Sequence, residues 1–204
     1  ALACGVLILS DAEGPRAVPA MAVLQTGSAD GGLTPLEAPL DRQRWNAIVI
    51  HHSGAPAGDA ATIARMQGGE GLVGLGYHFV IGNGQGMPDG FVYVGPRWNR
   101  QQPGAHVASM PRVSDTARVS LQRRPSPDDL NRHAIGICLV GNGDRREFTE
   151  RQLRELVALV RRLQRSLDIP SDRVILHGDV AETSSPGRYF PGAAFEEQLV
   201  RGNP

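Results

Sequence analysis

The sequence is poor in the features that mark several large classes of protein. Only two of its 204 residues are cysteines, Cys4 and Cys138, so we expect no disulfide framework. Its 21 basic and 21 acidic residues cancel to a formal net charge of zero, so charge favours neither nucleic acid nor an anionic membrane as a partner. A neutral, extended partner such as a glycan is compatible with this composition.

The chain starts without methionine, and residues 1–10 are apolar apart from Ser10. This pattern predicts the remnant of an export signal or anchor, although ten residues cannot span a bilayer, which takes ~20. Small residues followed by Cys4 also resemble the site at which bacterial lipoproteins are cleaved and acylated. We therefore expect an exported protein of the periplasm or cell envelope, with membrane contact only through an N-terminal anchor or a lipid on Cys4. The alternative is a short buried segment without targeting value.

Length and composition predict one folded domain. A chain of 204 residues with 41% apolar side chains can bury one core. Residues 11–44 are rich in Gly, Pro, Ala and Ser and read as a flexible arm. The domain itself is expected at residues 45–204, with an inserted surface loop at 109–130 that has no steady hydrophobic period.

Short apolar runs alternate with helical patterns along this domain. Strands are predicted at residues 47–50, 76–81, 91–94, 134–140 and 174–176, and helices at 59–66, 149–167 and 193–200. Thr149 and Gln152 are spaced as a capping box at the start of the longest helix. The prediction is an α/β fold with a central mixed β-sheet of about five strands covered by helices.

Two histidines follow separate apolar strands: His51 ends the run that starts at Ala47, and His177 follows Leu176. The carboxyl ends of strands are where α/β folds place their sites. Imidazole is the commonest zinc ligand, and catalytic zinc usually has three protein ligands and one open position. This placement favours a metal site that needs a third donor.

Six sequence blocks in a fixed order make the resemblance specific. They are residues 47–53 (AIVIHHS), 76–81 (GYHFVI), 104–106 (GAH), 134–141 (AIGICLVG), 177–180 (HGDV) and 185–187 (SPG). Over residues 45–191 the chain resembles the type 2 N-acetylmuramoyl-L-alanine amidases, which include phage lysozyme-type zinc amidases and peptidoglycan recognition proteins.

The resemblance implies a Zn²⁺ ion bound by His51, His177 and the residue at position 185, which is Cys or Asp in the family. Ser185 departs from this pattern, because a serine hydroxyl stays neutral near pH 7 and is a poor zinc donor. Three alternatives remain: zinc held by the two histidines and water, zinc held with help from a donor such as Asp179, or no zinc. An engineered cysteine-to-serine substitution would produce the same sequence.

The resemblance also implies the other site residues. Tyr77 takes the place of a catalytic residue that stabilises the oxyanion or passes a proton, and Thr183 takes a position held by Lys or Thr. Some members carry Glu where this chain has Cys138.

Substrate contacts are predicted for three further residues, His106, Trp98 and Asn99, with a core position as the equal alternative for Trp98. His52 and His78 are predicted to be structural, because adjacent strand residues face opposite sides.

The implied function is zinc-dependent hydrolysis of the amide between N-acetylmuramic acid and L-alanine in peptidoglycan or muropeptides. The alternative, favoured by Ser185, is a non-catalytic peptidoglycan-binding domain that has lost its third zinc ligand. A purely structural domain would leave the paired histidines and Tyr77 unexplained.

Overall fold

The computed structural model describes residues 40–68, 74–108 and 125–200, all within one compact unit, Pro35–Pro204. The predicted signal remnant at 1–10, most of the predicted arm and most of the predicted loop at 109–130 lie outside the described residues. No helix in the described part of the chain is long and apolar enough to cross a membrane.

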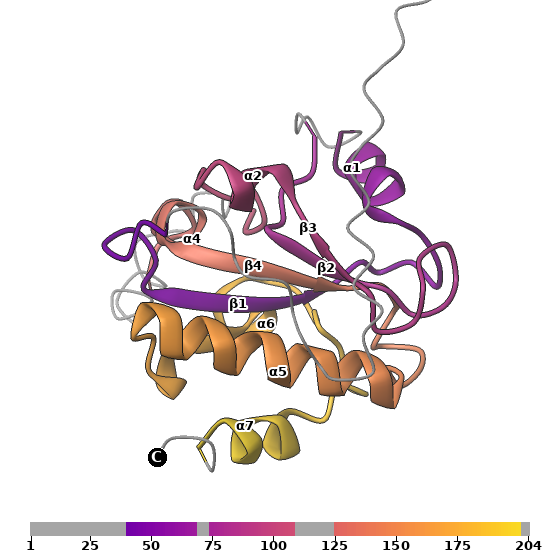
Figure 1. The fold of residues 1–204 in the computed structure, drawn as a ribbon. Helices are drawn as coiled ribbons and strands as arrows, with labels where there is room; N and C mark the ends of the chain where they lie inside the picture. The colour runs from indigo at the N-terminus through magenta and orange to yellow at the C-terminus, as the bar shows by residue number, and fades with distance from the viewer. Residues whose placement is uncertain (1–39, 69–73, 109–124, 201–204) are drawn as a thin grey trace, which may run out of the picture. The chain divides into compact units, whose positions relative to one another are not determined.

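A mixed sheet of five strands forms the centre of the domain, as predicted (Figure 1). Its spatial order is β3-β2-β4-β1-β5; β3 is antiparallel to β2, and the other neighbours are parallel. The strands are β1 (Ala47–His52), β2 (Phe79–Ile81), β3 (Val92–Val94), β4 (Ala134–Leu139) and β5 (Val174–Leu176).

Helices cover the sheet, with α5 and α7 on one side and α1 on the other (Figure 1). Their bounds are α1 (Ala60–Gly68), α2 (Pro96–Asn99), α4 (Pro127–His133), α5 (Glu150–Leu167), α6 (His177–Val180) and α7 (Gly192–Val200), with a 3-10 turn at Ser171–Arg173.

Alternation along β1 divides its side chains between two faces of the sheet. Ile48 and Ile50 belong to the main core with the apolar side of α5. Val49 belongs to a smaller cluster with Leu130 of α4, and His51 shares this second face because side chains two apart point the same way. His51 therefore lies on the face opposite the main core.

Helix α5 begins as its sequence predicts. The Thr149 hydroxyl accepts a hydrogen bond from Gln152 N at 3.0 Å, and the Gln152 side chain returns one to Thr149 N at 3.2 Å. The hydroxyl of Thr149 also donates to Asp89 at 2.6 Å. This capping box satisfies amide groups that would otherwise lack partners at the start of the helix.

The loop predicted at residues 109–130 ends earlier in the structure than the sequence indicated. Residues 127–130 belong to α4, which begins at an N-cap, Ser126, whose side chain accepts from Asp129 N. This helix has proline at its first position and aspartates in its first turn, which are common signals for a helix start. It is too short to show a regular spacing of hydrophobic residues, so these signals alone identify it.

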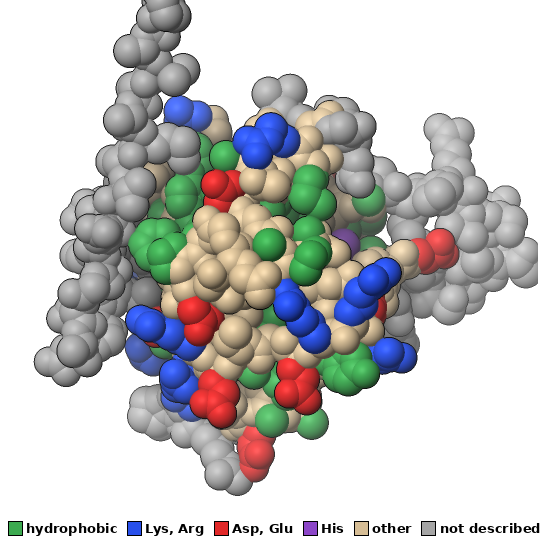
Figure 2. Space-filling view, turned by 90° about the vertical axis from the view of Figure 1, so that its right-hand side faces the viewer, with side chains coloured by type: hydrophobic (Ala, Val, Ile, Leu, Met, Phe, Trp, Pro, Cys, Tyr) green, Lys and Arg blue, Asp and Glu red, His purple; other side chains and the backbone are tan. Residues whose placement is uncertain are grey.

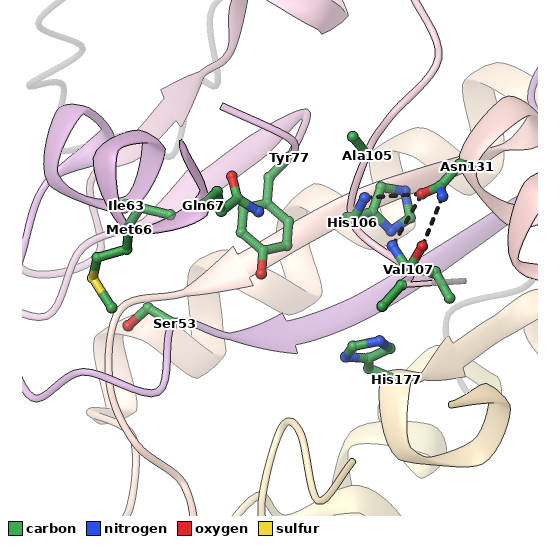
Figure 3. A pocket seen from close by; sticks show the side chains of 11 residues that line it. Ser53, Ile63, Met66, Gln67, Tyr77, Ala105, His106, Val107, Asn131 and His177 are labelled. Carbon is green, nitrogen blue, oxygen red and sulfur yellow. Dashed lines mark hydrogen bonds between the residues drawn. The ribbon is translucent and has the colours of Figure 1, made fainter. Parts of the chain in front are cut away.

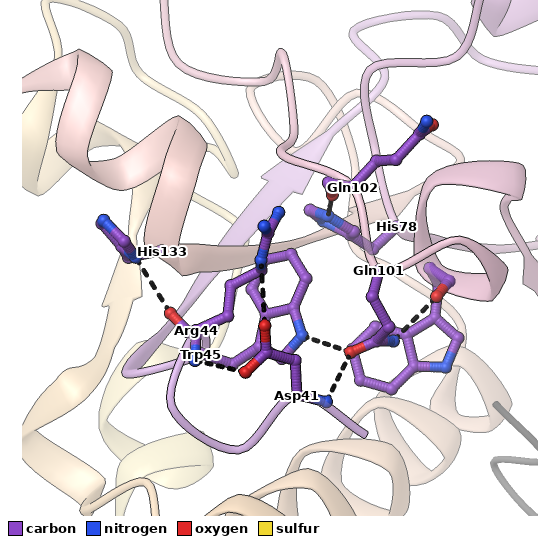
Figure 4. Close-up of polar contacts among 8 residues, drawn as sticks. Asp41, Arg44, Trp45, His78, Gln101, Gln102 and His133 are labelled. Atoms are coloured by element: carbon purple, nitrogen blue, oxygen red, sulfur yellow. Dashed lines mark hydrogen bonds and ion pairs between the residues drawn. The ribbon is translucent and has the colours of Figure 1, made fainter. Parts of the chain in front are cut away.

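The folded part also begins slightly before the predicted boundary at Trp45. The Gln101 side chain accepts hydrogen bonds from Trp45 Nε1 at 2.7 Å and from Asp41 N at 3.2 Å (Figure 4). The carbonyl oxygen of Arg44 lies 3.1 Å from Nδ1 of His133. These contacts attach the last residues of the predicted arm to the domain.

Candidate functional site

A cleft of about 490 Å³ lies on the second face of the sheet, near the carboxyl ends of the parallel strands. Tyr77, His106 and His177 line it, together with Ile63 and Met66 of α1 (Figure 3). On the face of the molecule in Figure 2, basic and acidic side chains are interspersed.

Two of the predicted metal ligands meet beside this cleft. The ring centroids of His51 and His177 are 4.2 Å apart, and His51 is fully buried. Within the described part of the chain, Nδ1 of His51 and Nε2 of His177 are buried without a hydrogen-bond partner. An unpaired buried polar atom costs ~1–3 kcal/mol, so these two nitrogens are suited to a ligand that accepts their lone pairs.

Ser185 is held next to both histidines by its own hydrogen bonds. Its hydroxyl accepts from His52 N, one residue after His51, at 3.0 Å. Its carbonyl oxygen accepts from Gly178 N, one residue after His177, at 2.7 Å. The structure thus brings together the three positions that the sequence predicts as a metal site, with Ser185 only 4% exposed.

Burial keeps the two histidines neutral at physiological pH. The pKa of His51 is lowered well below its usual 6.5, first by desolvation and then by the neighbouring His106 and His177. The pKa of His177 is lowered to about 4, by desolvation and then by His52. Neutral imidazole is the form that binds a metal, so both rings are in the required protonation state.

These residues fit a zinc ion at two positions and weakly at the third. Two neutral imidazoles supply good donors, whereas Ser185 supplies an uncharged hydroxyl. In residues 40–68, 74–108 and 125–200, no group of three His, Cys, Asp or Glu side chains could hold a metal ion. Asp179 therefore forms no such group with the two histidines; it is exposed, and its carboxylate accepts from Leu176 N at 3.3 Å. The suggestion that Asp179 supplies a further ligand is therefore corrected.

The two predicted catalytic residues have different surroundings. The Tyr77 ring lies 5.1 Å from the His51 ring, at the cleft. Beneath it, burial raises the pKa of the Cys138 thiol, and a hydrogen bond with the Tyr77 side chain partly offsets that rise. Thr183 is exposed, and its hydroxyl accepts from Ser185 N at 3.2 Å. Thr183 therefore supports Ser185, and its catalytic role stays a prediction.

The predicted substrate residues do not form one wall. Trp98 is 1% exposed and packs on Phe79 in the main core, so the prediction that it lines a sugar groove is corrected. Trp98 is buried because of its position on α2, which turns this side chain toward the sheet. Asn99 is exposed at the end of the same helix and does not line the described cleft, so its substrate contact stays a prediction.

His106 lines the cleft, but both of its ring nitrogens have partners within the protein. Nδ1 lies 3.0 Å from Nε2 of His51, and Nε2 lies 3.2 Å from the carbonyl oxygen of Ala134. Its pKa is lowered to about 3, mainly by burial and then by His78. A direct substrate contact of His106 remains a prediction, and its visible partner is His51.

The other two histidines of the motifs have hydrogen bonds that suit structural roles. His78 accepts from Gly136 N at 2.9 Å and lies 3.0 Å from the carbonyl oxygen of Gln102 (Figure 4). Nδ1 of His52 lies 2.8 Å from the carbonyl oxygen of Pro186.

Sequence reasoning missed several cleft residues. Ile63 and Met66 form an apolar wall from α1, and the side chain of Asn131 makes hydrogen bonds with His106 N, Val107 N and Val107 O at 2.8, 3.0 and 2.8 Å. Met66 is 48% exposed, so about half of its side chain is open to solvent at the cleft. Nothing in the local pattern around Asn131 indicates this role, because its partners are 24 and 25 residues away.

Comparison with known proteins identifies the family of the chain. The family model described as N-acetylmuramoyl-L-alanine amidase matches residues 41–188. A search of curated proteins found no match.

Among solved structures, the chain is similar to the N-acetylmuramoyl-L-alanine amidase LysC from Clostridium intestinale URNW, with 27% identity and a TM-score of 0.60 over 80% of this chain and 91% of that one. It is similar to the ectodomain complex of peptidoglycan recognition proteins LCa and LCx bound to tracheal cytotoxin, with 26% identity and a TM-score of 0.51 over 80% of this chain and 89% of that one. Peptidoglycan recognition protein LE, in complex with tracheal cytotoxin, a monomeric diaminopimelic acid-type peptidoglycan, shares the fold, with 21% identity and a TM-score of 0.50 over 79% of this chain and 85% of that one.

With a family model that spans most of the described domain, the chain belongs to the N-acetylmuramoyl-L-alanine amidase family, whose relatives include the peptidoglycan recognition proteins.

Proposed function

We propose that the protein is a zinc-dependent amidase that hydrolyses the amide between N-acetylmuramic acid and L-alanine in peptidoglycan or muropeptides. The observation that supports this most strongly is the pair of neutral histidines, His51 and His177, each with a buried ring nitrogen that has no hydrogen-bond partner beside the cleft. Family membership and the likeness to an amidase at 27% identity support the same reaction.

His51 and His177 would hold the zinc ion, with Ser185 beside them. When bound, the ion lowers the pKa of its water and polarises the scissile carbonyl group. The chain's own task is to present lone pairs from two neutral rings and to keep them in place. His51 does so from the rigid end of β1, and His177 from the first residue of α6.

Tyr77 is placed to act on the substrate. Its ring lies at the cleft and 5.1 Å from His51, so the phenol can donate a hydrogen bond to an oxyanion formed near that histidine. A buried neutral thiol, Cys138, occupies the position where some relatives have Glu, so a general base from this strand is not part of the proposal. The leaving amine then depends on Tyr77 or solvent for its proton.

The cleft walls are suited to a muropeptide. Ile63 and Met66 offer apolar surface to a sugar ring or a methyl group, and Gln67 and Asn131 add polar groups on the lining. The likeness to the recognition proteins bound to tracheal cytotoxin, at 26% identity, supports a muropeptide as ligand.

A second function is favoured by one specific observation. Ser185 offers a neutral hydroxyl that already accepts a hydrogen bond from His52 N. A site weakened in this way would suit a peptidoglycan-binding domain that holds muropeptide without cutting it. Export to the cell envelope and lipid attachment at Cys4 belong to the same proposal and rest on the sequence alone.

Hydrolysis of a muramoyl-peptide separates the two functions. The purified protein is incubated with the substrate, with zinc or with a chelator, and release of the peptide that begins with L-alanine is followed by mass spectrometry. Zinc-dependent release supports the amidase. Binding of the muropeptide without release, together with release by Ser185→Cys, would contradict it and support the binding domain.

A further inference from the structure

Two hydrogen bonds in series run beneath the cleft and end on a backbone carbonyl group. Nε2 of His51 lies 3.0 Å from Nδ1 of His106, and Nε2 of His106 lies 3.2 Å from the carbonyl oxygen of Ala134. A carbonyl oxygen can only accept a hydrogen bond, so Nε2 of His106 must carry the proton. In a neutral ring, Nδ1 of His106 then accepts, and Nε2 of His51 must donate.

This order of donors decides where the lone pair of His51 points. With its proton on Nε2, the ring of His51 has its lone pair on Nδ1, which is the buried nitrogen without a partner. The opposite tautomer would place two lone pairs against each other between His51 and His106, only 3.0 Å apart. The Ala134 carbonyl group therefore selects the tautomer of a ring that it does not touch.

Two glycines, Gly104 and Gly136, leave room for the His106 ring. A Cβ atom added at Gly136 would lie 2.5 Å from Cδ2 of His106, and one added at Gly104 would clash with the same atom. Both contacts would be shorter than the 3.0 Å below which real Cβ atoms essentially never approach another atom. The ring thus fits only because these two residues have no side chain.

The backbone of His106 is fixed as well. Asn131 accepts from the amide of His106 at 2.8 Å and from that of Val107 at 3.0 Å, and its side-chain amide donates to the Val107 carbonyl oxygen at 2.8 Å. Figure 3 shows Asn131 beside His106 and Val107 with these bonds. So many constraints on a side chain only 5% exposed indicate that its orientation matters.

We infer that His106 is a positioning residue, which fixes the tautomer of His51 so that the Nδ1 lone pair faces the metal site. The inference rests on the proposed function, in which His51 is a zinc ligand. Metal-ligating histidines commonly donate their second ring N–H to an outer partner, and loss of that partner costs 10–100-fold in metal affinity or activity. Here the partner is a second histidine instead of a carboxylate or carbonyl group.

The tautomer itself is measured first, by NMR of the metal-free protein labelled with nitrogen-15 histidine. Both His51 and His106 are expected to show a protonated Nε2 and an unprotonated Nδ1. In His106→Ala, water fills the vacated space and can donate or accept, so His51 is expected to show a mixture of tautomers. A protonated Nδ1 on His51 in the unchanged protein would overturn the inference.

Zinc affinity is measured next by calorimetry, in the protein as it stands and with Ser185→Cys as a second background. We expect His106→Ala to weaken zinc binding by about 10–100-fold. Gly136→Ala should also weaken zinc binding, because the added methyl group displaces the His106 ring although the variant removes no polar group. His106→Asn should recover part of the loss, because its amide oxygen can accept from His51.

His78→Asn is the matched control. His78 is as buried as His106, and its ring lies 5.8 Å from the His106 ring. Its own bonds go to Gly136 N and the Gln102 carbonyl group, and the Asn side chain can accept and donate in their place, so the surroundings of His106 are kept. It should change zinc affinity by less than about threefold. Equal losses from His78→Asn and His106→Ala, or unchanged affinity in His106→Ala, would overturn the inference.

Failure of the proposed function gives a different result. If the unchanged protein binds no zinc, the amidase proposal fails, whereas the NMR measurement and the Ser185→Cys background still decide the role of His106.

Discussion

The backbone amide of His52 donates a hydrogen bond to the hydroxyl of Ser185 across 3.0 Å. This bond places the neutral side chain of Ser185 beside the histidine that precedes His52. Because Ser185 is 4% exposed, its hydroxyl has little access to water that could compensate for a weak metal bond. In the proposed zinc site, position 185 is therefore expected to set how tightly the metal is held.

Replacement of this hydroxyl by a thiol should strengthen zinc binding. Ser185→Cys brings a thiolate to the same place, and we expect a gain of more than ~100-fold in zinc affinity, since the new ligand contacts the metal directly. Calorimetry or competition with a chelator measures it. Ser184→Cys is the matched control, because Ser184 is exposed and bonds to Asp144. Equal gains in both variants would show that position 185 is not a ligand position.

Loss of either histidine should abolish what zinc binding the protein has. His51→Ala and His177→Ala each remove one of the two good donors, so zinc affinity should fall below detection, and hydrolysis with it. His133→Ala serves as the control, because His133 is exposed and its partner is the Arg44 carbonyl group. Retention of zinc by His177→Ala would require a different donor set.

Removal of the Tyr77 hydroxyl should slow hydrolysis while zinc stays bound. Tyr77→Phe keeps the ring at the cleft and deletes the group that can donate to an oxyanion, so kcat should fall about 10²–10³-fold. Zinc affinity should change little. Tyr93→Phe, on the half-buried strand β3, controls for general effects of losing a phenol. An unchanged kcat in Tyr77→Phe would remove this residue from the mechanism.

Acid should destabilise the metal-free protein through its buried histidines. Burial lowers the pKa of His78 to about 4 and that of His106 to about 3, whereas the unfolded chain titrates near 6.5. Between these pKa values the unfolded chain binds more protons than the folded protein. The free energy of unfolding therefore has its highest value above about pH 6.5 and decreases as the pH drops below it. Each such histidine contributes a slope of ~1.4 kcal/mol per pH unit in that window.

Urea unfolding at several pH values between about 7.5 and 5, with chelator present, measures this slope. His78→Asn should have a shallower slope than the unchanged protein by about the contribution of one histidine. A slope that does not change would mean that His78 titrates alike in both states.

The cap of α5 should have a measurable effect on stability. Thr149→Ala loses the bond from Gln152 N and the bond to Asp89, and caps of this kind contribute ~1 kcal/mol or somewhat more to the free energy of unfolding. Thr149→Ser keeps the hydroxyl and should recover most of the loss. Chemical unfolding measures both, and equal losses would assign the effect to the methyl group instead.

The elements that the sequence predicted well are those with a strong local signal. The long helix has a capping box and a regular apolar face, and β1 and β4 are continuous apolar runs. The helix α4 was missed because its only signals are the capping serine, proline and two aspartates at its start. The position of Trp98 depends on which way a four-residue helix turns, which no local pattern reveals.

The site was predicted in part for the same reason. His51 and His177 lie at the ends of strands that the local apolar pattern identifies. The order of the sequence motifs then indicated that Ser185 belongs to the same site. The bond from His51 to His106 spans 55 residues and depends on how loop 104–107 packs against β4, so no spacing in the sequence could reveal it. Long-range packing of this kind follows only from the folded chain.

The central claim, that two histidines hold zinc beside Ser185, is tested most directly by crystals soaked in zinc and measured on both sides of the zinc absorption edge. We predict an anomalous peak within bonding distance of two atoms, Nδ1 of His51 and a ring nitrogen of His177. No charged side chain should lie within bonding distance of this peak. The absence of a peak between the two rings, in crystals of protein that binds muropeptide, would contradict the claim and leave a peptidoglycan-binding domain.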